Sequence, residues 1–281
     1  MSGRRSALVA GGQQRFGRRG QARSLARLFR IFWPSLPSLI GSVLFALGAV
    51  EAGATEGAEP HTLQDAPFIC ANVVLAIDGS KSTGEGDFGR QTEAFRAAFD
   101  GEPLYQAIQD CLPGSVAFAM MTWSGPDQQD LCLNWSLVAN REDGRRLARH
   151  FARCRYFGGS TDIGRAVDYG LRLLERSPLV SYYRIVFILT NGRTDRGADA
   201  ALSAARAQAE AAAVTLAGYA LLRPEPKNPS PFFVPSARPL ERYVADHVSA
   251  GPRSFTAYSR PSDDAATLLR ALIEMLRQEA S

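Results

Sequence analysis

Three short polar segments of this sequence carry side chains that could together hold a metal ion. The segments are Asp78-Gly79-Ser80-Lys81-Ser82, Gly159-Ser160-Thr161-Asp162 and Thr190-Asn191-Gly192. They offer one carboxylate, three hydroxyls and one amide as candidate ligands, from Asp78, Ser80, Ser82, Thr161 and Asn191. Such oxygen ligands suit Mg²⁺, Mn²⁺ or Ca²⁺ better than zinc or copper. Because Mg²⁺ keeps several waters and needs only one or two carboxylates, it leaves a position open for an acidic group of a partner.

Predicted strands and helices alternate around these segments. Short, nearly continuous apolar runs predict strands buried on both faces, at 72–78, 115–123, 130–137, 183–190, 214–222 and 254–259. Helices are predicted at about 87–110, 142–154, 162–176, 198–213 and 239–248, with a last helix from 261 to the end of the sequence. The turn at 124–127 predicts that 130–137 returns as a hairpin. Residues 223–238 contain five prolines and predict a long loop.

This alternation predicts an α/β fold, in which a doubly wound, mostly parallel sheet has helices on both faces and one antiparallel edge strand, as in Rossmann-like folds. In such sheets, ligands bind at the carboxyl ends of the strands, near the point where the strand order reverses. Asp78 and Thr190 end two predicted strands, so we expect the three polar segments to meet at that edge. We expect one domain over 70–281, preceded by a polar lead-in over 55–69.

The three segments resemble the metal-ion-dependent adhesion site of von Willebrand factor A domains, which integrin I domains share. The first motif of that family, D-x-S-x-S, matches Asp78, Ser80 and Ser82, and its later threonine matches Thr161. The third motif departs from the family, because Asn191 stands where the family has an aspartate. One formal negative charge is therefore missing from the site.

The resemblance covers about 70–278, and more narrowly the chain is similar to a group of exported bacterial A-domain proteins of unknown function. In that group a Trp-Ser-Gly-Pro turn follows the second strand, as at 123–126 here, and a Gly-Pro-x-x-Phe segment precedes the last strand, as at 251–255. The resemblance implies a non-catalytic protein-binding module. Its divalent cation would be held by Asp78, Ser80, Ser82 and Thr161, with Asn191 supporting them, and would engage a carboxylate of a partner protein.

Two other functions stay open. One is a metal-free scaffold of the same fold, which would bind through other surfaces, such as 223–238. Asn191 in place of aspartate favours this alternative. Ser80 and Ser82 would then only cap the following helix. A hydrolase would use the same metal to activate water, with Asp162 or Asp195 as the base. The sequence contains no G-x-S-x-G, Walker or H-E-x-x-H motif that would point to another common catalytic site.

The first 54 residues predict a secretory signal peptide or, if uncleaved, an N-terminal anchor. They contain eight arginines and one acidic residue, an apolar run within 31–50, and the small residues Ala52-Gly53-Ala54, which fit a signal-peptidase site. The unbroken part of the run, 39–50, is too short to span a hydrocarbon core of about 30 Å. We therefore expect export to the periplasm or the extracellular space, with membrane contact only through this segment.

The positive charge of the chain belongs to this N-terminal segment. The net charge of the whole chain is +4, and residues 1–54 account for +7, so the remainder carries −3. A body of that charge has no general attraction for a polyanion, which argues against nucleic acid as a partner.

All four cysteines, Cys70, Cys111, Cys132 and Cys154, lie after the predicted signal. An even number in an exported chain suggests two disulfides, and four buried free thiols are the alternative. In the fold that the resemblance implies, Cys70 and Cys111 lie at the end of the sheet opposite the adhesion site, whereas Cys132 and Cys154 lie nearer to it. The implied pairs are therefore Cys70–Cys111 and Cys132–Cys154.

Overall fold

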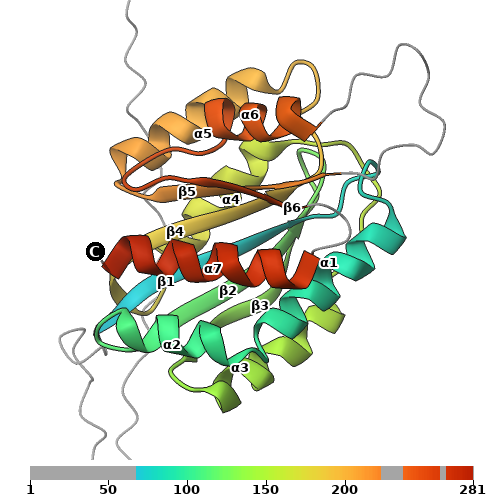
Figure 1. Ribbon diagram of the computed structural model, residues 1–281. Coiled ribbons are helices and arrows are strands. Elements are labelled where there is room, and N and C mark those ends of the chain that lie inside the picture. Colours follow the sequence, from blue (N-terminus) through green and yellow to red (C-terminus); the bar gives the residue numbers. More distant parts are fainter. Residues whose placement is uncertain (1–67, 223–236, 260–263, 281) are drawn as a thin grey trace, which may run out of the picture. The chain divides into compact units, whose positions relative to one another are not determined.

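A six-stranded sheet runs through the middle of the computed structural model (Figure 1), which describes residues 68–222, 237–259 and 264–280. The strands are β1 (Phe68–Asp78), β2 (Val116–Trp123), β3 (Gln129–Val138), β4 (Val180–Thr190), β5 (Thr215–Leu221) and β6 (Thr256–Ser259). Their order in the sheet is β3-β2-β1-β4-β5-β6. Neighbouring strands are parallel except β2 and β3, so the predicted antiparallel strand lies at an edge.

Helices cover both faces of this sheet (Figure 1). One face carries α1 (Glu85–Ala98), α2 (Glu102–Asp110), α3 (Arg141–Ala148) and α7 (Asp264–Ala280), and the other carries α4 (Ile163–Glu175), α5 (Asp199–Ala211) and α6 (Ala237–His247). The predicted doubly wound α/β fold is therefore confirmed. Within the described residues, no helix combines the length and the apolar character needed to cross a bilayer.

The central strand β1 contributes to both hydrophobic cores. Val73 and Leu75 belong to the core beneath α1 and α7, and Val74 and Ala76 belong to the core beneath α4 and α5. Every residue of β1 after Phe68 is buried. Because both faces of the strand are covered, its sequence is apolar without alternation.

The strand order reverses between β1 and β4. From β1 the chain proceeds to β2 and β3 on one side, and it then crosses to β4 on the other side. Asp78 ends β1 and Thr190 ends β4. Both residues therefore lie beside the switch point, where a doubly wound sheet binds its ligands.

The predicted boundaries differ from the structure by up to four residues at strand ends, as at β1, which begins at Phe68 instead of 72, and they differ more in two helical regions. The single helix predicted at 87–110 is two helices, because Gly101 precedes α2 and Pro103 occupies its first turn, where proline suits a helix start but not a helix interior. The helix predicted at 142–154 ends at Ala148 and is followed by a 3₁₀ turn, Arg149–Arg153. The signal predicted over 1–54, the lead-in up to 67 and residues 223–236 of the proline-rich loop lie outside the described residues.

Gly164 allows α4 to approach α5 closely. A Cβ at this position would lie 2.5 Å from Leu202 N and 2.8 Å from Leu202 Cα, so the backbone of α5 would have to move. We expect Gly164→Ala to lower the free energy of unfolding by about 1–3 kcal/mol, the usual cost of overpacking. Urea unfolding measures the change. The control is Gly89→Ala, whose Cβ would meet no atom within 4 Å; equal midpoints for both variants would contradict the close approach.

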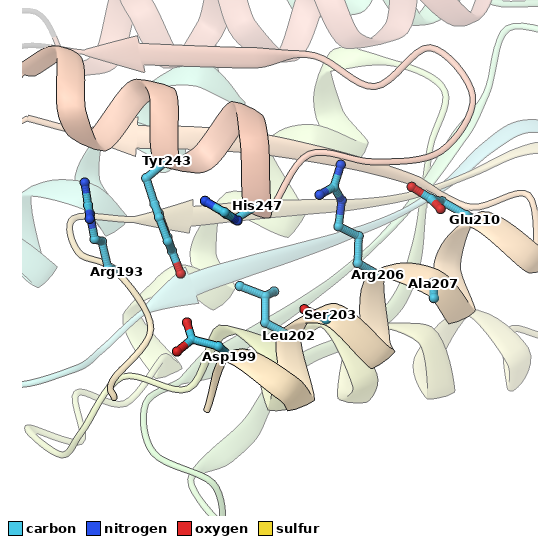
Figure 2. A pocket seen from close by; sticks show the side chains of 9 residues that line it. All are labelled: Arg193, Asp199, Leu202, Ser203, Arg206, Ala207, Glu210, Tyr243 and His247. Carbon is cyan, nitrogen blue, oxygen red and sulfur yellow. The ribbon is translucent and has the colours of Figure 1, made fainter. Parts of the chain in front are cut away.

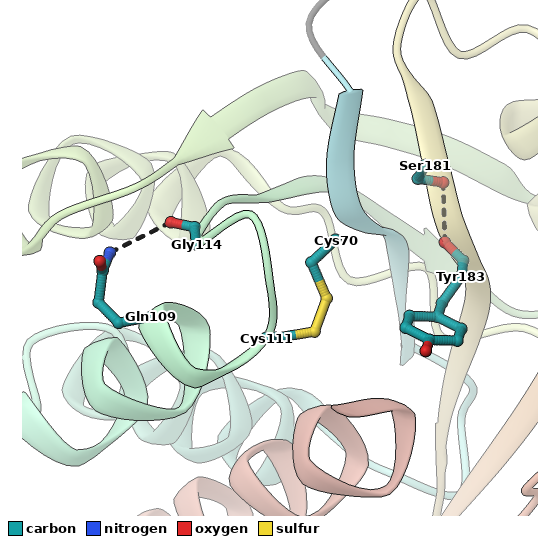
Figure 3. Close-up of a disulfide and its surroundings, with 6 residues drawn as sticks. All are labelled: Cys70, Gln109, Cys111, Gly114, Ser181 and Tyr183. Atoms are coloured by element: carbon teal, nitrogen blue, oxygen red, sulfur yellow. Dashed lines mark hydrogen bonds between the residues drawn. A yellow bond between two sulfur atoms is a disulfide. The ribbon is translucent and has the colours of Figure 1, made fainter. Parts of the chain in front are cut away.

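The two disulfides implied by the resemblance are present, and all four cysteines are paired. Cys70–Cys111 joins the start of β1 to the end of α2 (Figure 3), with Cα atoms 5.7 Å apart. Cys132–Cys154 joins β3 to the residue after the 3₁₀ turn, with Cα atoms 4.9 Å apart. Both separations lie in the range that a disulfide normally spans.

Candidate metal site

The Asp78 carboxylate forms the buried base of the site. Its Oδ1 accepts a hydrogen bond from Ser80 N (2.8 Å), and its Oδ2 accepts from Thr190 Oγ1 (2.8 Å) and Asn191 N (3.4 Å). The side chain is 0% exposed. This burial raises the pKa of Asp78 above its ordinary value, although the hydrogen bonds act in the opposite direction.

The charge of Asp78 has no cationic partner among the described residues. Lys81 lies in the same turn but is exposed, and the guanidinium of Arg193 is 5.1 Å from the ring centroid of Tyr243. A buried carboxylate with only neutral donors is costly to ionise. The base of the site is therefore suited to take up either a proton or a metal ion.

Above this base, toward the surface, the site contains Ser80, Ser82 and Asn191. Ser80 Oγ and Ser82 Oγ lie 3.0 Å apart, and Ser82 Oγ donates to Asn191 Oδ1 over 2.8 Å. Ser80 and Asn191 are buried, whereas Ser82 is exposed. A serine that donates its single proton keeps lone pairs on its oxygen. Ser82 can therefore face a cation while it remains bonded to Asn191.

Thr161 lies on the loop that adjoins this cluster. Lys81 N donates to Gly159 O (2.7 Å), which joins that loop to the Asp78 turn. Thr161 N donates to Asp195 Oδ2 (2.9 Å), and Asp195 N donates back to Thr161 O (2.8 Å). The loop after β4 thus fixes the backbone of Thr161, whose side chain is buried.

The turn after β2 joins the first motif to the threonine loop. Trp123 O accepts from Gly79 N (2.8 Å), and Ser124 O accepts from Asp162 N (2.9 Å). Ser124 Oγ also donates to Ser160 O (2.6 Å). From the sequence alone, the Trp-Ser-Gly-Pro turn is only a mark of family resemblance. In the structure Trp123 is fully buried, and the turn has the additional role of holding the site loops together.

The two aspartates considered as catalytic bases already have structural partners. Asp162 caps α4, since its Oδ1 accepts from Arg165 N (3.0 Å). Asp195 accepts from the backbone of Thr161. Both carboxylates therefore stabilise the loop and the helix, and the hydrolase interpretation gains no support from them.

Most of the predicted ligands come together in the structure. Four of the five form one hydrogen-bonded cluster, and Thr161 lies on the adjoining loop; the four are Asp78, Ser80, Ser82 and Asn191. The sequence placed Thr190 at this edge but not among the site residues, and it did not predict that its hydroxyl donates to Asp78. Its position, as the polar last residue of a buried strand directly before Asn191, was the available signal.

The chemistry of this donor set limits the metals it could hold. Among the described residues, no group of three or more His, Cys, Asp or Glu side chains is placed to hold a metal ion. A cation here would therefore depend on one carboxylate, several hydroxyls and water. Mg²⁺ fits such a set because it normally retains several waters and takes only one or two carboxylates from the protein.

Solved structures with the same fold include von Willebrand factor A domains. The pilus adhesin SpaC of Lactobacillus rhamnosus GG aligns with a TM-score of 0.50 and 11% identity, over 75% of this chain and 31% of SpaC. A von Willebrand factor type A protein from Catenulispora acidiphila aligns with a TM-score of 0.47 and 18% identity, over 76% and 43%. The manganese-loaded TRAP protein of Plasmodium vivax aligns with a TM-score of 0.44 and 12% identity, over 72% and 73%. This chain spans less than half of the first two structures, and at these identities the likeness describes the fold alone.

Comparison with the curated proteins finds no match. The family model described as "Protein of unknown function (DUF1194)" matches residues 69–279, which is most of the chain. The fold that the resemblance implies is therefore confirmed, and the chain belongs to the DUF1194 family of proteins of unknown function.

Proposed function

We propose that this protein is an exported, non-catalytic binding module that uses a divalent cation, first of all Mg²⁺, to engage a carboxylate of a partner protein. The observation that carries the proposal is Asp78, a fully buried carboxylate with three neutral donors and no cationic partner among the described residues. A cation beside it would neutralise a charge whose burial is otherwise unfavourable.

Each predicted ligand has a role in this proposal. Asp78 would offer the cation its carboxylate, and Ser80, Ser82 and Thr161 would offer hydroxyl oxygens. Asn191 would support them through its bond to Ser82. A divalent cation supplies an electrophile with an open coordination position, which a carboxylate of the partner can occupy. With a single protein carboxylate, the loaded site would keep a formal charge of about +1, which attracts an acidic partner.

Export and the absence of catalysis are also parts of the proposal. The disulfides Cys70–Cys111 and Cys132–Cys154 are typical of proteins that fold in oxidising compartments. They agree with the signal predicted over 1–54. Asp162 and Asp195 each accept a hydrogen bond from a backbone N–H, which supports a binding role for the site over a hydrolytic one.

The test uses Mn²⁺ as a probe, because waters on protein-bound Mn²⁺ enhance the relaxation of solvent protons. We expect enhancement with the disulfide-intact protein, and we expect it to fall when a short aspartate-containing peptide displaces a bound water. Asp78→Asn should lose both effects. The matched control is Asp127→Asn, which removes an exposed carboxylate from the turn after β2. Equal relaxation in wild type and Asp78→Asn would contradict the proposal.

A second candidate function is a metal-free scaffold that binds through other surfaces. The hydrogen bond from Ser82 Oγ to Asn191 Oδ1 favours it, because a neutral amide closes the site where the family has a carboxylate. Under this alternative, the cluster only stabilises the carboxyl edge of the sheet.

Asn191→Asp distinguishes the two candidates. A second carboxylate is expected to tighten Mg²⁺ binding by about tenfold, because affinity rises with the number of charged ligands. In EDTA the same change should lower the melting temperature, since two nearby carboxylates repel each other. Calorimetric titration measures the affinity. Mg²⁺ binding by Asn191→Asp but not by wild type would favour the scaffold, whereas no binding by either would contradict a metal site.

A further inference from the structure

A groove leaves the candidate metal site at Asn191 and follows α6. Its first hollow, of about 280 Å³, is lined by Asn191, Gly192 and Arg193 on one side, and on the other by Leu221, Leu222, Pro239 and Leu240. Two further hollows, of about 410 and 510 Å³, share Arg193, Tyr243 and His247. Arg193 lines all three hollows, and residues of α5 and α6 line the largest of them.

The first hollow is suited to a single apolar side chain. The residues that line it opposite Asn191 are three leucines and a proline. Its volume lies at the lower end of the usual range of about 300–1,000 Å³ for pockets that enclose a whole small molecule. A side chain that projects from a bound peptide would fill this space better than a free ligand would.

The second hollow carries an excess of positive charge. Arg193 and Arg242 line it together with His247, and Asp246 is the one acidic residue among those lining it. Figure 2 shows Arg193 beside Tyr243 at one end of the wider space and Arg206 with Glu210 at the other. A formal charge of +1 near the metal site, with histidine neutral, suits an acidic group of a ligand.

Tyr243 fixes this groove relative to the site. Its hydroxyl accepts a hydrogen bond from Thr194 N (3.2 Å), and the Arg193 guanidinium lies over its ring. Arg193 also donates to Pro239 O over 3.4 Å. These contacts join α6 to the loop that carries Asn191, so the apolar and cationic hollows lie next to the cluster.

We infer that the partner binds as an extended acidic segment rather than through one isolated carboxylate. One carboxylate occupies the metal site, an adjacent apolar side chain enters the hollow beside Leu222 and Leu240, and a second acidic side chain meets Arg193 and Arg242. The inference rests on the proposed function, since the metal site supplies the first contact. It adds the class of ligand and the residues that select it.

Two capped tripeptides, Asp-Leu-Glu and Asp-Ser-Glu, test the inference by NMR titration of the full protein in Mg²⁺. The leucine peptide should bind more tightly and should shift the amides of Leu222 and Leu240 as well as that of Ser82. Arg193→Gln should weaken its binding by about fivefold, or ~1 kcal/mol at 1.4 kcal/mol per tenfold. Arg196→Gln, which removes an exposed arginine from the same loop, should leave binding unchanged.

The possible outcomes separate the inference from the proposed function. A separate Mg²⁺ titration reports on the metal site alone, and both arginine variants should retain it. If Mg²⁺ binds but the two peptides bind equally, or Arg193→Gln and Arg196→Gln behave alike, the groove is not the subsite. If Mg²⁺ does not bind, the proposed function fails. Changes in the amide chemical shifts of Leu222 and Leu240 when peptide is added in EDTA would then show that the groove binds the peptide without a metal ion.

Discussion

Asp78→Asn is expected to unfold at a higher temperature than wild type in EDTA at pH 8, and at a lower temperature in millimolar Mg²⁺. The amide can still accept from Ser80 N, and it can donate to Thr190 Oγ1, which has Gly192 O as an alternative acceptor at 3.0 Å. Only Asn191 N, at 3.4 Å from Asp78 Oδ2, loses its acceptor. The variant therefore loses the cost of a buried charge and few hydrogen bonds. In Mg²⁺, a cation at 100 times its Kd stabilises wild type by about 2.7 kcal/mol, which raises Tm by several degrees in a domain of this size.

The same variant should change how stability depends on pH. Burial raises the pKa of Asp78 in the folded protein above its value in the unfolded chain. The folded state therefore binds the proton more tightly, and in EDTA its stability falls as pH rises from the unfolded pKa through the folded pKa. Each pKa unit of this difference is worth about 1.4 kcal/mol. Asp78→Asn should lack this fall, whereas Asp127→Asn should keep it; parallel pH profiles for wild type and Asp78→Asn would contradict the buried charge.

Loss of the Cys132–Cys154 disulfide is expected to weaken Mg²⁺ binding about tenfold, or ~1.4 kcal/mol, while loss of Cys70–Cys111 leaves it unchanged. Cys154 directly precedes the segment in which Phe157 N (3.2 Å) and Gly158 N (2.9 Å) donate to Gly79 O. Gly79 lies between Asp78 and Ser80, so the disulfide stabilises the first motif from outside. Cys70 lies eight residues before Asp78 along β1, roughly 26 Å away at ~3.3 Å per residue.

The two disulfides form a matched pair for this experiment. Each double Cys→Ala variant should lower the free energy of unfolding by about 2–4 kcal/mol, because either bond restricts the unfolded chain. Urea unfolding measures that loss, and calorimetric titration measures the Mg²⁺ affinity at a temperature where both variants are folded. An equal change of affinity in the two variants would show that only global stability matters.

Local patterns were sufficient to predict most of this fold. The run 72–78 and the run 183–190 are apolar without alternation because both faces of β1 and β4 are covered by helices. The break between α1 and α2 was missed, although Gly101 and Pro103 are both local signals. An apolar periodicity that continues across a short turn hides such a break, because both helices pack on the same face of the sheet.

The candidate site was less completely predictable. Asp78, Ser80 and Ser82 are adjacent in the sequence, so their pattern is visible without a structure. The supporting bond from Thr190 and the role of Ser124 depend on contacts between residues far apart in the chain. The groove beyond Asn191 was not predicted, because it combines the ends of β4 and β5 with the start of α6, and no local pattern reports which side chains meet across three segments.

The main-chain bonds between the site loops have an evolutionary consequence. Three hydrogen bonds of 2.7–2.8 Å join the backbones of these loops, from Gly79 N to Trp123 O, from Lys81 N to Gly159 O and from Asp195 N to Thr161 O. These bonds do not depend on which side chains stand at the ligand positions. Descendants of one ancestral sequence can therefore exchange aspartate and asparagine at 191, in either direction, without rebuilding the edge of the sheet. If the site binds metal as proposed, such an exchange would let a lineage lose its dependence on metal and later regain it, while the main-chain frame of the site stays the same.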